Sequence, residues 1–360
     1  MSLVDDALYD ASGYGLLGAS SIAALYRDPA VLATERTHLF SASWALVASA
    51  DEVAARGSYV TASAGGIPLA VVRGADGALR AFHNVCRHRG MTLLEGSGTV
   101  GRFMTCPYHQ WSYATTGELV RVPQEDDQFG AVDRCALGLG PAQVAVWGGM
   151  VFANPSLHAP GLPQTMAGLD ARLDGFLAGP LRQVAVVRYE AACNWKLLVE
   201  NHIDVYHLWY LHARSLAAYD HRKFSWESLG DNWWSLEPMM EPQPQGGFAW
   251  VPEGMRHHIG AYLLFPNLML VTTDEYFASY DAVPVAADRT VLTLRVRSSD
   301  DCDADALVAS IRSFMAEDVT ACERMQQGAA SPWFGVGALA STHEDPIRRF
   351  HASLLRAVAP

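Results

Sequence analysis

The sequence Cys86-Arg-His88 is followed, after seventeen residues, by Cys106-Pro-Tyr-His109. Each segment lets one short loop present a thiolate and an imidazole to a common site. Two thiolates and two imidazoles suit either tetrahedral zinc or a 2Fe-2S cluster with histidine on one iron. Zinc sites commonly pair Cys with Cys and His with His, whereas each half here places one Cys before one His. This order favours an iron–sulfur cluster, with structural zinc as the alternative.

The length of 360 residues and the surrounding sequence predict an α+β protein of two domains. From Trp44 to Pro155 the chain consists of short alternating runs broken by glycine-containing turns, which is typical of β-structure. The proline-containing stretch 155–163 interrupts this pattern, and strand-like and helical segments are mixed beyond it. We expect an N-terminal helical segment over residues 1–43 that packs on the second domain, an all-β domain over 44–155 and a mixed domain over 156–360.

A second group of polar residues lies in the otherwise apolar segment 194–212. Glu200, Asp204 and His207 would share one face of an ideal helix, while His212 would point about 140° away from His207. A distortion or a helix end must therefore intervene if both histidines bind one metal. Fe(II) centres that activate O2 use two His and one carboxylate. The alternative is that both histidines are core residues paired with nearby carboxylates.

Two parts of the chain resemble a known family. The patterns C-x-H-R-G and C-P-Y-H-x-W are similar to the Rieske domain of ring-hydroxylating and related oxygenases, and E-N-x-x-D-x-Y-H-x-x-x-x-H over residues 200–212 is similar to their catalytic domain. The resemblance implies that Cys86 and Cys106 hold one iron of a 2Fe-2S cluster and that His88 and His109 hold the other. Gln110 stands where glycine is frequent in the family, which leaves the loop geometry at this position open.

The resemblance also implies a second metal centre. It selects His207, His212 and Asp318 as the ligands of one mononuclear Fe(II) per chain. Glu317 is the adjacent rival for the carboxylate position. Asp204 is assigned the role of a bridging acid between an iron-bound His and a cluster His of the neighbouring subunit. This arrangement implies a homotrimer.

The fold implied by the resemblance is an all-β Rieske domain followed by a helix-grip-like catalytic domain, an antiparallel sheet covered by helices. The implied function is that of a terminal oxygenase, which uses O2 to hydroxylate or oxidatively demethylate an aromatic acid or a methylated amine. Electrons would come from NAD(P)H through a separate flavin and iron–sulfur reductase, with or without a ferredoxin, because the chain has no nucleotide-binding fingerprint. An electron-transfer protein without oxygenase activity is the alternative.

Composition narrows the remaining function classes. The net charge of -12 and a pI near 5.5 give no field that would attract nucleic acid or an anionic membrane. The N-terminus carries acidic residues where a secretory signal would be basic, and the longest apolar run, 144–153, is about half of what spans a bilayer. Six cysteines are too few for a disulfide framework in a chain of this length. A cytoplasmic location is expected.

The sequence says less about the substrate. Residues 209–265 are rich in aromatic side chains, which predict either a cage for a quaternary ammonium group or, more commonly, ordinary core packing. Arg256, His257 and His258 form a basic group that would suit a substrate carboxylate or a solvated loop.

Overall fold

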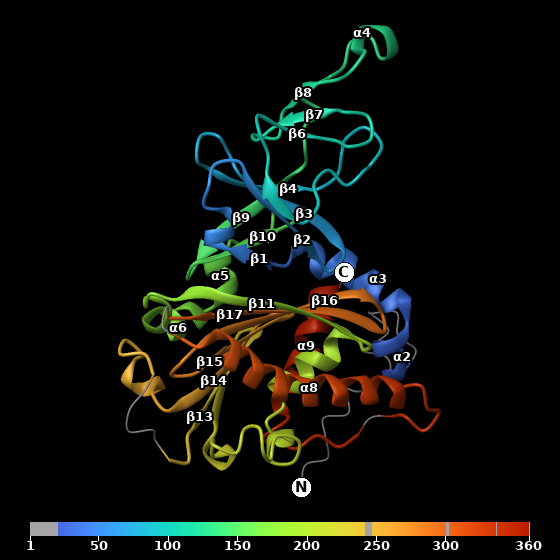
Figure 1. Cartoon of the computed structure of the whole chain (residues 1–360). Coiled ribbons are helices and arrows are strands. Elements are labelled where there is room, and N and C mark those ends of the chain that lie inside the picture. Colours follow the sequence, from blue (N-terminus) through green and yellow to red (C-terminus); the bar gives the residue numbers. More distant parts are fainter. Residues whose placement is uncertain (1–20, 242–246, 300–301, 336, 360) are drawn as a thin grey trace. The chain divides into compact units, whose positions relative to one another are not determined.

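The computed structural model describes residues 21–241, 247–299, 302–335 and 337–359. Contacts divide the chain into two units, one of residues 40–162 and one of residues 1–39 together with 163–360. Each unit is built around a seven-stranded antiparallel sheet (Figure 1). The first 20 residues of the predicted N-terminal segment lie outside the described residues. Of the rest, 22–27 and 29–38 are helical.

The unit of residues 40–162 is almost entirely β-structure, as the alternating sequence predicts. Its large sheet has the order β1-β10-β9-β4-β3-β2-β5, and a small sheet has the order β6-β7-β8. The strands are β1 (Ala45–Ser49), β2 (Ser58–Ala64), β3 (Ile67–Arg73), β4 (Leu79–His83), β5 (Ser97–Thr99), β6 (Phe103–Thr105), β7 (Ser112–Ala114), β8 (Leu119–Arg121), β9 (Pro141–Trp147) and β10 (Met150–Asn154). Short helical turns occur at η3 (Phe40–Ala42), η4 (Ala50–Val53) and α4 (Glu125–Gln128). Two glycines at positive φ, Gly148 and Gly149, turn the apolar run 144–153 into a strand pair.

The second unit combines one sheet with helices. Its sheet has the order β11-β17-β16-β15-β14-β13-β12, so that the last six strands along the chain pair as a meander. These strands are β11 (Arg182–Ala191), β12 (Ser225–Leu229), β13 (Asn232–Pro238), β14 (His258–Leu264), β15 (Leu268–Thr272), β16 (Phe277–Ala286) and β17 (Arg289–Ser298). The helical elements are α2 (Ile22–Arg27), α3 (Pro29–His38), α5 (Leu162–Met166), α6 (Leu169–Leu177), α7 (Trp195–Ile203), η5 (Tyr206–Trp209), η6 (His221–Lys223), η7 (Glu253–Met255), α8 (Ala304–Gly328) and α9 (Asp345–Val358). The prediction of an antiparallel sheet covered by helices is confirmed.

Helix α7 packs on β14 and β16 and contacts α8 along its length. It begins at the side chain of Asn194, which accepts a hydrogen bond from the backbone N–H of Lys196 at 3.0 Å. It ends at Ile203, because Asp204 adopts an extended conformation. A helix end therefore lies between Glu200 and His207, as binding of one metal by both His207 and His212 requires, and it allows the later residues to turn back towards α8.

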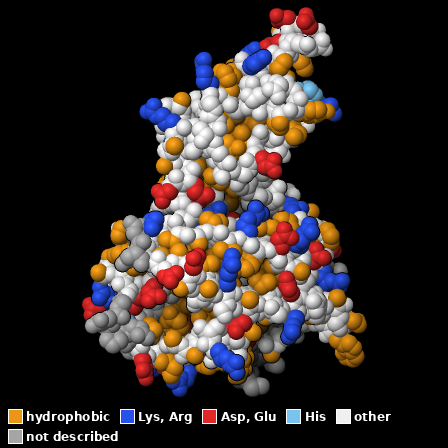
Figure 2. All heavy atoms as spheres, in the orientation of Figure 1, with side chains coloured by type: hydrophobic (Ala, Val, Ile, Leu, Met, Phe, Trp, Pro, Cys, Tyr) orange, Lys and Arg blue, Asp and Glu red, His pale blue; other side chains and the backbone are white. Residues whose placement is uncertain are grey.

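Charged side chains of both signs are scattered over the face shown in Figure 2. Acidic side chains gather at the tip formed by α4, whose first turn contains Glu125, Asp126 and Asp127. Within the described ranges, no helix combines the length and the apolar character that crossing a bilayer requires.

Candidate metal centres

The two Cys/His segments form loops with the same backbone geometry. In each loop the cysteine N–H donates to the carbonyl five residues later at 2.8 Å, and the cysteine carbonyl accepts from the N–H four residues later at 3.0 Å. The fourth residue after the cysteine is Gly90 in the first loop, with φ +74°, and Gln110 in the second, with φ +61°. The departure from glycine at position 110 therefore does not alter the loop, because Gln110 adopts the left-handed conformation.

These loops bring two thiols and two imidazoles together. Cys86 and Cys106 are both buried and free of disulfide bonds. The rings of His88 and His109 lie 4.7 Å apart between centroids. The Nδ1 atom of His88 is buried and has no hydrogen-bond partner among the described residues. An orphaned imidazole nitrogen beside two buried thiols fits a cluster with two Cys and two His ligands.

Aromatic side chains enclose this group. The indole of Trp111 stacks on His88 at 4.8 Å with an interplanar angle of 11°. The hydroxyl of Tyr113 accepts from the Arg87 N–H at 3.0 Å and lies 3.4 Å from the Cys86 sulfur. Burial raises the pKa of the Cys86 thiol. A buried thiolate in this apolar setting needs a positive partner, which a cluster iron supplies.

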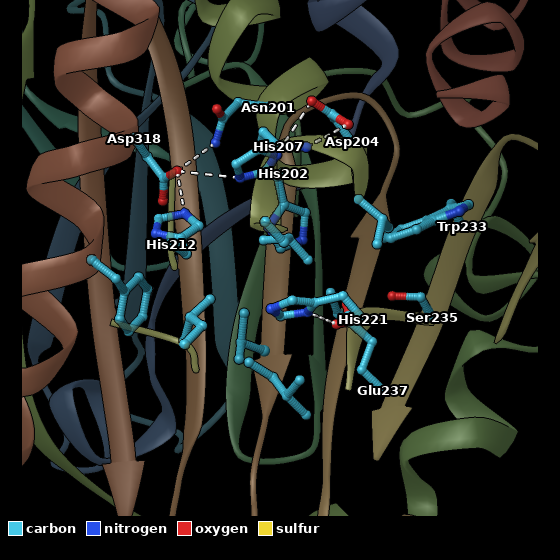
Figure 3. A pocket seen from close by; sticks show the side chains of 17 residues that line it. Asn201, His202, Asp204, His207, His212, His221, Trp233, Ser235, Glu237 and Asp318 are labelled. Atoms are coloured by element: carbon cyan, nitrogen blue, oxygen red, sulfur yellow. Dashed lines mark hydrogen bonds and ion pairs between the residues drawn. The ribbon is translucent and has the colours of Figure 1, made fainter. Parts of the chain in front are cut away.

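The second group of side chains lies in the other unit, where η5 and the turn after it face α8. The ligand atoms of His207, His212 and Asp318 all lie within 4.8 Å of one another. One carboxylate oxygen of Asp318 is 2.8 Å from His212 Nε2 and 3.5 Å from His207 Nε2 (Figure 3). Two imidazoles and one carboxylate converging from one side form the donor set that non-haem Fe(II) prefers.

Neighbouring groups fix the orientation of these three side chains. The side-chain amide of Asn201 donates to Asp318 at 2.9 Å. The Nδ1 atom of His212 is 2.8 Å from Glu317, and the hydroxyl of Ser215 donates to the same Glu317 oxygen at 2.6 Å. Glu317 thus contacts the outer nitrogen of His212, whereas Asp318 contacts the inner one. This geometry favours Asp318 over its adjacent rival as a ligand and gives Glu317 the role of orienting the ring.

Asp204 stands on the opposite side of His207. Its carboxylate accepts from the Tyr206 N–H at 2.6 Å and lies 3.3 Å from His207 Nδ1. Burial lowers the pKa of His207, but the carboxylates of Asp204 and Asp318 outweigh burial and raise it to about 9. Burial likewise acts to raise the pKa of Asp318, but His207 and His212 hold it well below its usual range. The Asp318 carboxylate is therefore ionised, as a metal ligand must be.

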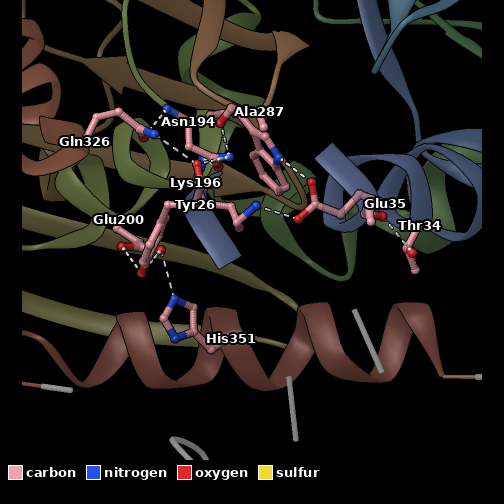
Figure 4. A network of polar contacts seen from close by, with 11 residues as sticks. Tyr26, Thr34, Glu35, Asn194, Lys196, Glu200, Ala287, Gln326 and His351 are labelled. Atoms are coloured by element: carbon pink, nitrogen blue, oxygen red, sulfur yellow. Dashed lines mark hydrogen bonds and ion pairs between the residues drawn. The ribbon is translucent and has the colours of Figure 1, made fainter. Parts of the chain in front are cut away.

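Glu200 does not share this face. Its carboxylate contacts other residues than the candidate iron ligands. It accepts a hydrogen bond from the Tyr26 hydroxyl at 3.1 Å and lies 2.8 Å from His351 Nε2 (Figure 4). The expected common face of Glu200, Asp204 and His207 is wrong because the helix ends before Asp204.

A cavity of about 90 Å³ adjoins the His207, His212 and Asp318 group. Most of its wall is apolar, with Leu208, Leu216, Ile259, Val271 and Phe314 among the lining residues. Of the Phe, Trp and Tyr side chains in the aromatic-rich region 209–265, Trp233 is among the described lining residues, while Trp234, Phe248 and Tyr262 are buried elsewhere. Arg256, from the basic group 256–258, does not line this cavity. It donates to the carbonyls of Ala249 and Val251 and so supports a loop.

Sequence reasoning missed several residues that line this cavity or orient the site. The missed residues are Asn201, Ser215, His221, Ser235 and Glu237. For Ser235 and Glu237 a signal was present, because polar residues alternate in the buried strand β13. Asn201 belongs to the quoted E-N-x-x-D pattern but was given no role, and no local pattern indicated Ser215 or His221.

Comparison with known proteins follows the two units. Residues 43–138 match the family described as the Rieske [2Fe-2S] domain, and residues 179–359 match the ring hydroxylating alpha subunit (catalytic domain). The second match spans half of the chain. This protein belongs to the ring-hydroxylating oxygenase alpha-subunit family. The family prediction is confirmed, and with it a cofactor set of one 2Fe-2S cluster and one mononuclear iron.

Members of the alpha-subunit family are 30–37% identical to this chain over the aligned parts. The glycine betaine monooxygenase oxygenase subunit of Chromohalobacter salexigens is 37% identical over 51% of this chain and 40% of its own. The carnitine monooxygenase oxygenase subunit of Escherichia coli strain K12 is 30% identical over 70% of this chain and 67% of its own. The chain spans about half the length of the first curated relatives it matches.

Solved structures of the family extend the likeness to nearly the whole chain. A quaternary ammonium Rieske monooxygenase in complex with L-carnitine has a TM-score of 0.80 at 25% identity, covering 94% of this chain and 95% of its own. Naphthalene 1,2-dioxygenase from Rhodococcus sp. has a TM-score of 0.77 at 21% identity, covering 93% of each chain. The second likeness shows a shared fold.

The two carboxylates beside His212 lead to a first prediction for this alpha subunit. Asp318→Asn is expected to abolish tight binding of the mononuclear iron, because asparagine supplies no anionic ligand. Glu317→Gln should weaken iron binding by about 10–100-fold without abolishing it, because glutamine can still contact His212 Nδ1. Competition with an iron chelator measures both affinities. Equal loss of iron in the two variants would contradict the separate roles.

Gln110 gives a second prediction. A non-glycine residue in the left-handed conformation costs about 1–2 kcal/mol, so Gln110→Gly should raise the free energy of unfolding by up to about 1 kcal/mol. Gly90→Ala is the matched variant in the other loop and should lower it by a similar amount, since space around Gly90 is open and only its φ is at issue. Denaturant unfolding followed by fluorescence and visible absorption tests both. Destabilisation by Gln110→Gly would refute the argument.

Proposed function

We propose that this chain is the terminal oxygenase component of a multicomponent Rieske oxygenase that oxidatively demethylates a small methylated amine. The observation that carries the proposal is the convergence of His207, His212 and Asp318 within 4.8 Å beside a largely apolar cavity, in a chain that also contains a Rieske domain. An electron carrier has no use for such a group, so the alternative of a carrier without oxygenase activity loses its basis.

The metal ligands follow from the contacts of each site. Cys86 and Cys106 would hold one cluster iron, and His88 and His109 the other. His207, His212 and Asp318 would hold the mononuclear Fe(II). When bound, these centres supply stored electrons and an open position for O2. The chain itself contributes an ionised Asp318, ligand rings oriented by neighbouring residues, and a cavity wall that limits the access of water.

Asp204 would join the two centres between subunits. Its carboxylate already contacts His207 Nδ1, and it remains partly exposed at 16%. A carboxylate in this position can accept a second hydrogen bond from an imidazole of another subunit. We infer a homotrimer on this basis, with electrons supplied by a separate NAD(P)H-dependent reductase.

The relatives guide the choice of substrate. The relatives named above include oxygenase subunits of glycine betaine and carnitine monooxygenases. Glycine betaine and carnitine both carry an N-methyl group on a quaternary nitrogen. Hydroxylation of such a methyl group takes one oxygen atom from O2, while two electrons and two protons reduce the other atom to water. The C–N bond of the hydroxymethyl group then breaks. The carbon leaves as formaldehyde, the hydroxyl proton is released to water, and the nitrogen keeps the bonding pair.

Turnover with a reductase, NADH and 18O2 tests the proposal. Glycine betaine or carnitine should yield stoichiometric formaldehyde labelled with 18O before exchange, together with the demethylated amine. His212→Ala should abolish formaldehyde release while retaining the visible spectrum of the cluster. Oxidation of a benzoate or a chlorobenzene in place of the amines would move the chain to the aromatic branch of the family, a branch represented among its relatives by the alpha subunit of a chlorobenzene dioxygenase.

A further inference from the structure

The cavity beside the iron-binding residues has a second polar region that the metal site does not use. His221, Ser235 and Glu237 line it together with the apolar residues already described. Figure 3 shows them in a group separate from His207, His212 and Asp318. Trp233, Ser235 and Glu237 alternate along β13, which places them on one face of the strand, towards the cavity. We call His221, Ser235 and Glu237 the polar pole.

His221 and Glu237 form a close pair within the pole. The Nδ1 atom of His221 is 2.5 Å from a carboxylate oxygen of Glu237, and the two residues are 7% and 4% exposed. An ionised carboxylate can only accept, so Nδ1 carries the hydrogen in this bond. The other ring nitrogen, Nε2, has no described partner, and the ring extends from Glu237 into the cavity (Figure 3). The imidazole therefore presents one polar atom to a ligand.

Ser235 provides a second unused polar atom. The residue is 1% exposed, and its hydroxyl has no hydrogen-bond partner among the described residues. Buried hydroxyl groups are nearly always hydrogen-bonded, because leaving one unsatisfied destabilises the fold. In Figure 3 the oxygen of Ser235 points towards the His221 and Glu237 pair. An unsatisfied hydroxyl in a cavity wall indicates a ligand that supplies the missing acceptor.

We propose that the polar pole binds the carboxylate of the substrate. The Ser235 hydroxyl and the Nε2–H of His221 donate to the two carboxylate oxygens, and Glu237 fixes the ring through Nδ1. The His221 ring then lies between two carboxylates, one of the protein and one of the substrate. Charge-assisted bonds of this kind are the strong ones in proteins. The remaining carbons of the substrate extend along the apolar wall towards the iron-binding residues.

This inference deepens the proposed function, and it rests on that function for the identity of the reaction only. Glycine betaine and carnitine both carry a carboxylate in addition to the methylated nitrogen, and so do aromatic acids. The polar pole would thus select substrates with a carboxylate, whether the oxidised part is a methylated amine or an aromatic ring. It also explains why a cavity with apolar walls holds three buried polar side chains away from the metal ligands.

Binding to the anaerobic holoenzyme, measured by titration calorimetry without turnover, tests the inference. Two probe pairs differ mainly in the carboxylate, namely glycine betaine against choline and benzoate against benzyl alcohol. For at least one skeleton the carboxylate should bind about 10-fold to 100-fold more tightly than its alcohol. Ser235→Ala should reduce this ratio by about 10-fold. It should leave the melting temperature unchanged or raised, because the hydroxyl it removes bonds to no described residue.

Control variants separate binding from folding. Tyr189→Phe also removes a buried hydroxyl without a described partner, but Tyr189 does not line the cavity, so this variant should keep the wild-type ratio. Replacing His221 alone leaves Glu237 buried and unpaired, so the second variant is the double replacement His221→Phe with Glu237→Met. It should abolish the preference for carboxylates. In turnover assays Ser235→Ala should raise KM for a carboxylate substrate more than it lowers kcat.

Four outcomes would overturn the inference. The first three are a wild-type ratio of carboxylate to alcohol affinity near one for both pairs, failure of both glycine betaine and benzoate to bind, and a ratio that is unchanged in both Ser235→Ala and the double variant. The fourth is tighter binding of choline than of glycine betaine, which would indicate a cation site at Glu237. If the protein prefers carboxylates but demethylates no N-methyl compound, carboxylate binding at the polar pole is supported and the proposed reaction is refuted. If it demethylates without that preference, the reaction is supported and carboxylate binding at the polar pole is refuted.

Discussion

Asp204→Asn is expected to lower product formation by about 10–100-fold while both metal centres stay loaded. Asparagine matches the size of aspartate and can still accept from the Tyr206 N–H. It removes the negative charge 3.3 Å from His207 Nδ1. Because Asp204 is not placed among the ligands, the iron should remain while the proposed contact with a neighbouring subunit weakens.

Stopped-flow reoxidation of the reduced protein by O2 and substrate measures this effect. Metal content should be determined on the same preparation, so that slow reoxidation is not confused with loss of iron. Asp305→Asn is a suitable control, since Asp305 is an exposed residue in the first turn of α8. Wild-type reoxidation in Asp204→Asn would refute the bridging role.

Lys196→Met is expected to lower the free energy of unfolding by about 3–5 kcal/mol. The ammonium of Lys196 lies 2.6 Å from Glu35, and both side chains are fully buried (Figure 4). The other carboxylate oxygen of Glu35 accepts from the indole of Trp195 at 2.9 Å. Methionine fills similar volume, so the loss comes from leaving the Glu35 charge buried with a single donor.

Denaturant unfolding, followed by the fluorescence of the catalytic unit, measures this loss of stability. Arg172→Met removes an exposed ion pair with Glu227 and a cation–π contact with Trp234 at 4.2 Å, and should lower the free energy of unfolding by no more than about 1 kcal/mol. The double replacement Glu35→Leu with Lys196→Met should recover most of the stability, because it removes both charges together. A single Lys196→Met variant as stable as wild type would show that the pair contributes little.

Local sequence pattern predicted the fold class well. Alternating runs and glycine turns from Trp44 to Pro155 predicted β-structure, and the strands of the unit of residues 40–162 lie in this stretch. The apolar spacing did not show where helix α7 ends. The apolar spacing of residues 195–211 continues past Asp204, but the helix ends there, where Asp204 adopts an extended conformation.

The candidate metal ligands could be named from the sequence, but the contacts that distinguish their roles could not. Only the packing of α8 on α7 shows that Asp318 meets the inner nitrogen of His212 and Glu317 the outer one. The polar pole was out of reach for the same reason, since His221 and Glu237 become partners through the docking of η6 on β13. Long-range placement of this kind leaves no periodic signal in a single sequence.

Metal and sulfide analysis of anaerobically purified wild type beside His207→Ala determines whether the chain holds both metal centres. We expect about three irons and two sulfides per chain in wild type, and about two irons with an unchanged red-brown spectrum in the variant. Two irons in both proteins would contradict the mononuclear site, and zinc without sulfide would contradict the cluster.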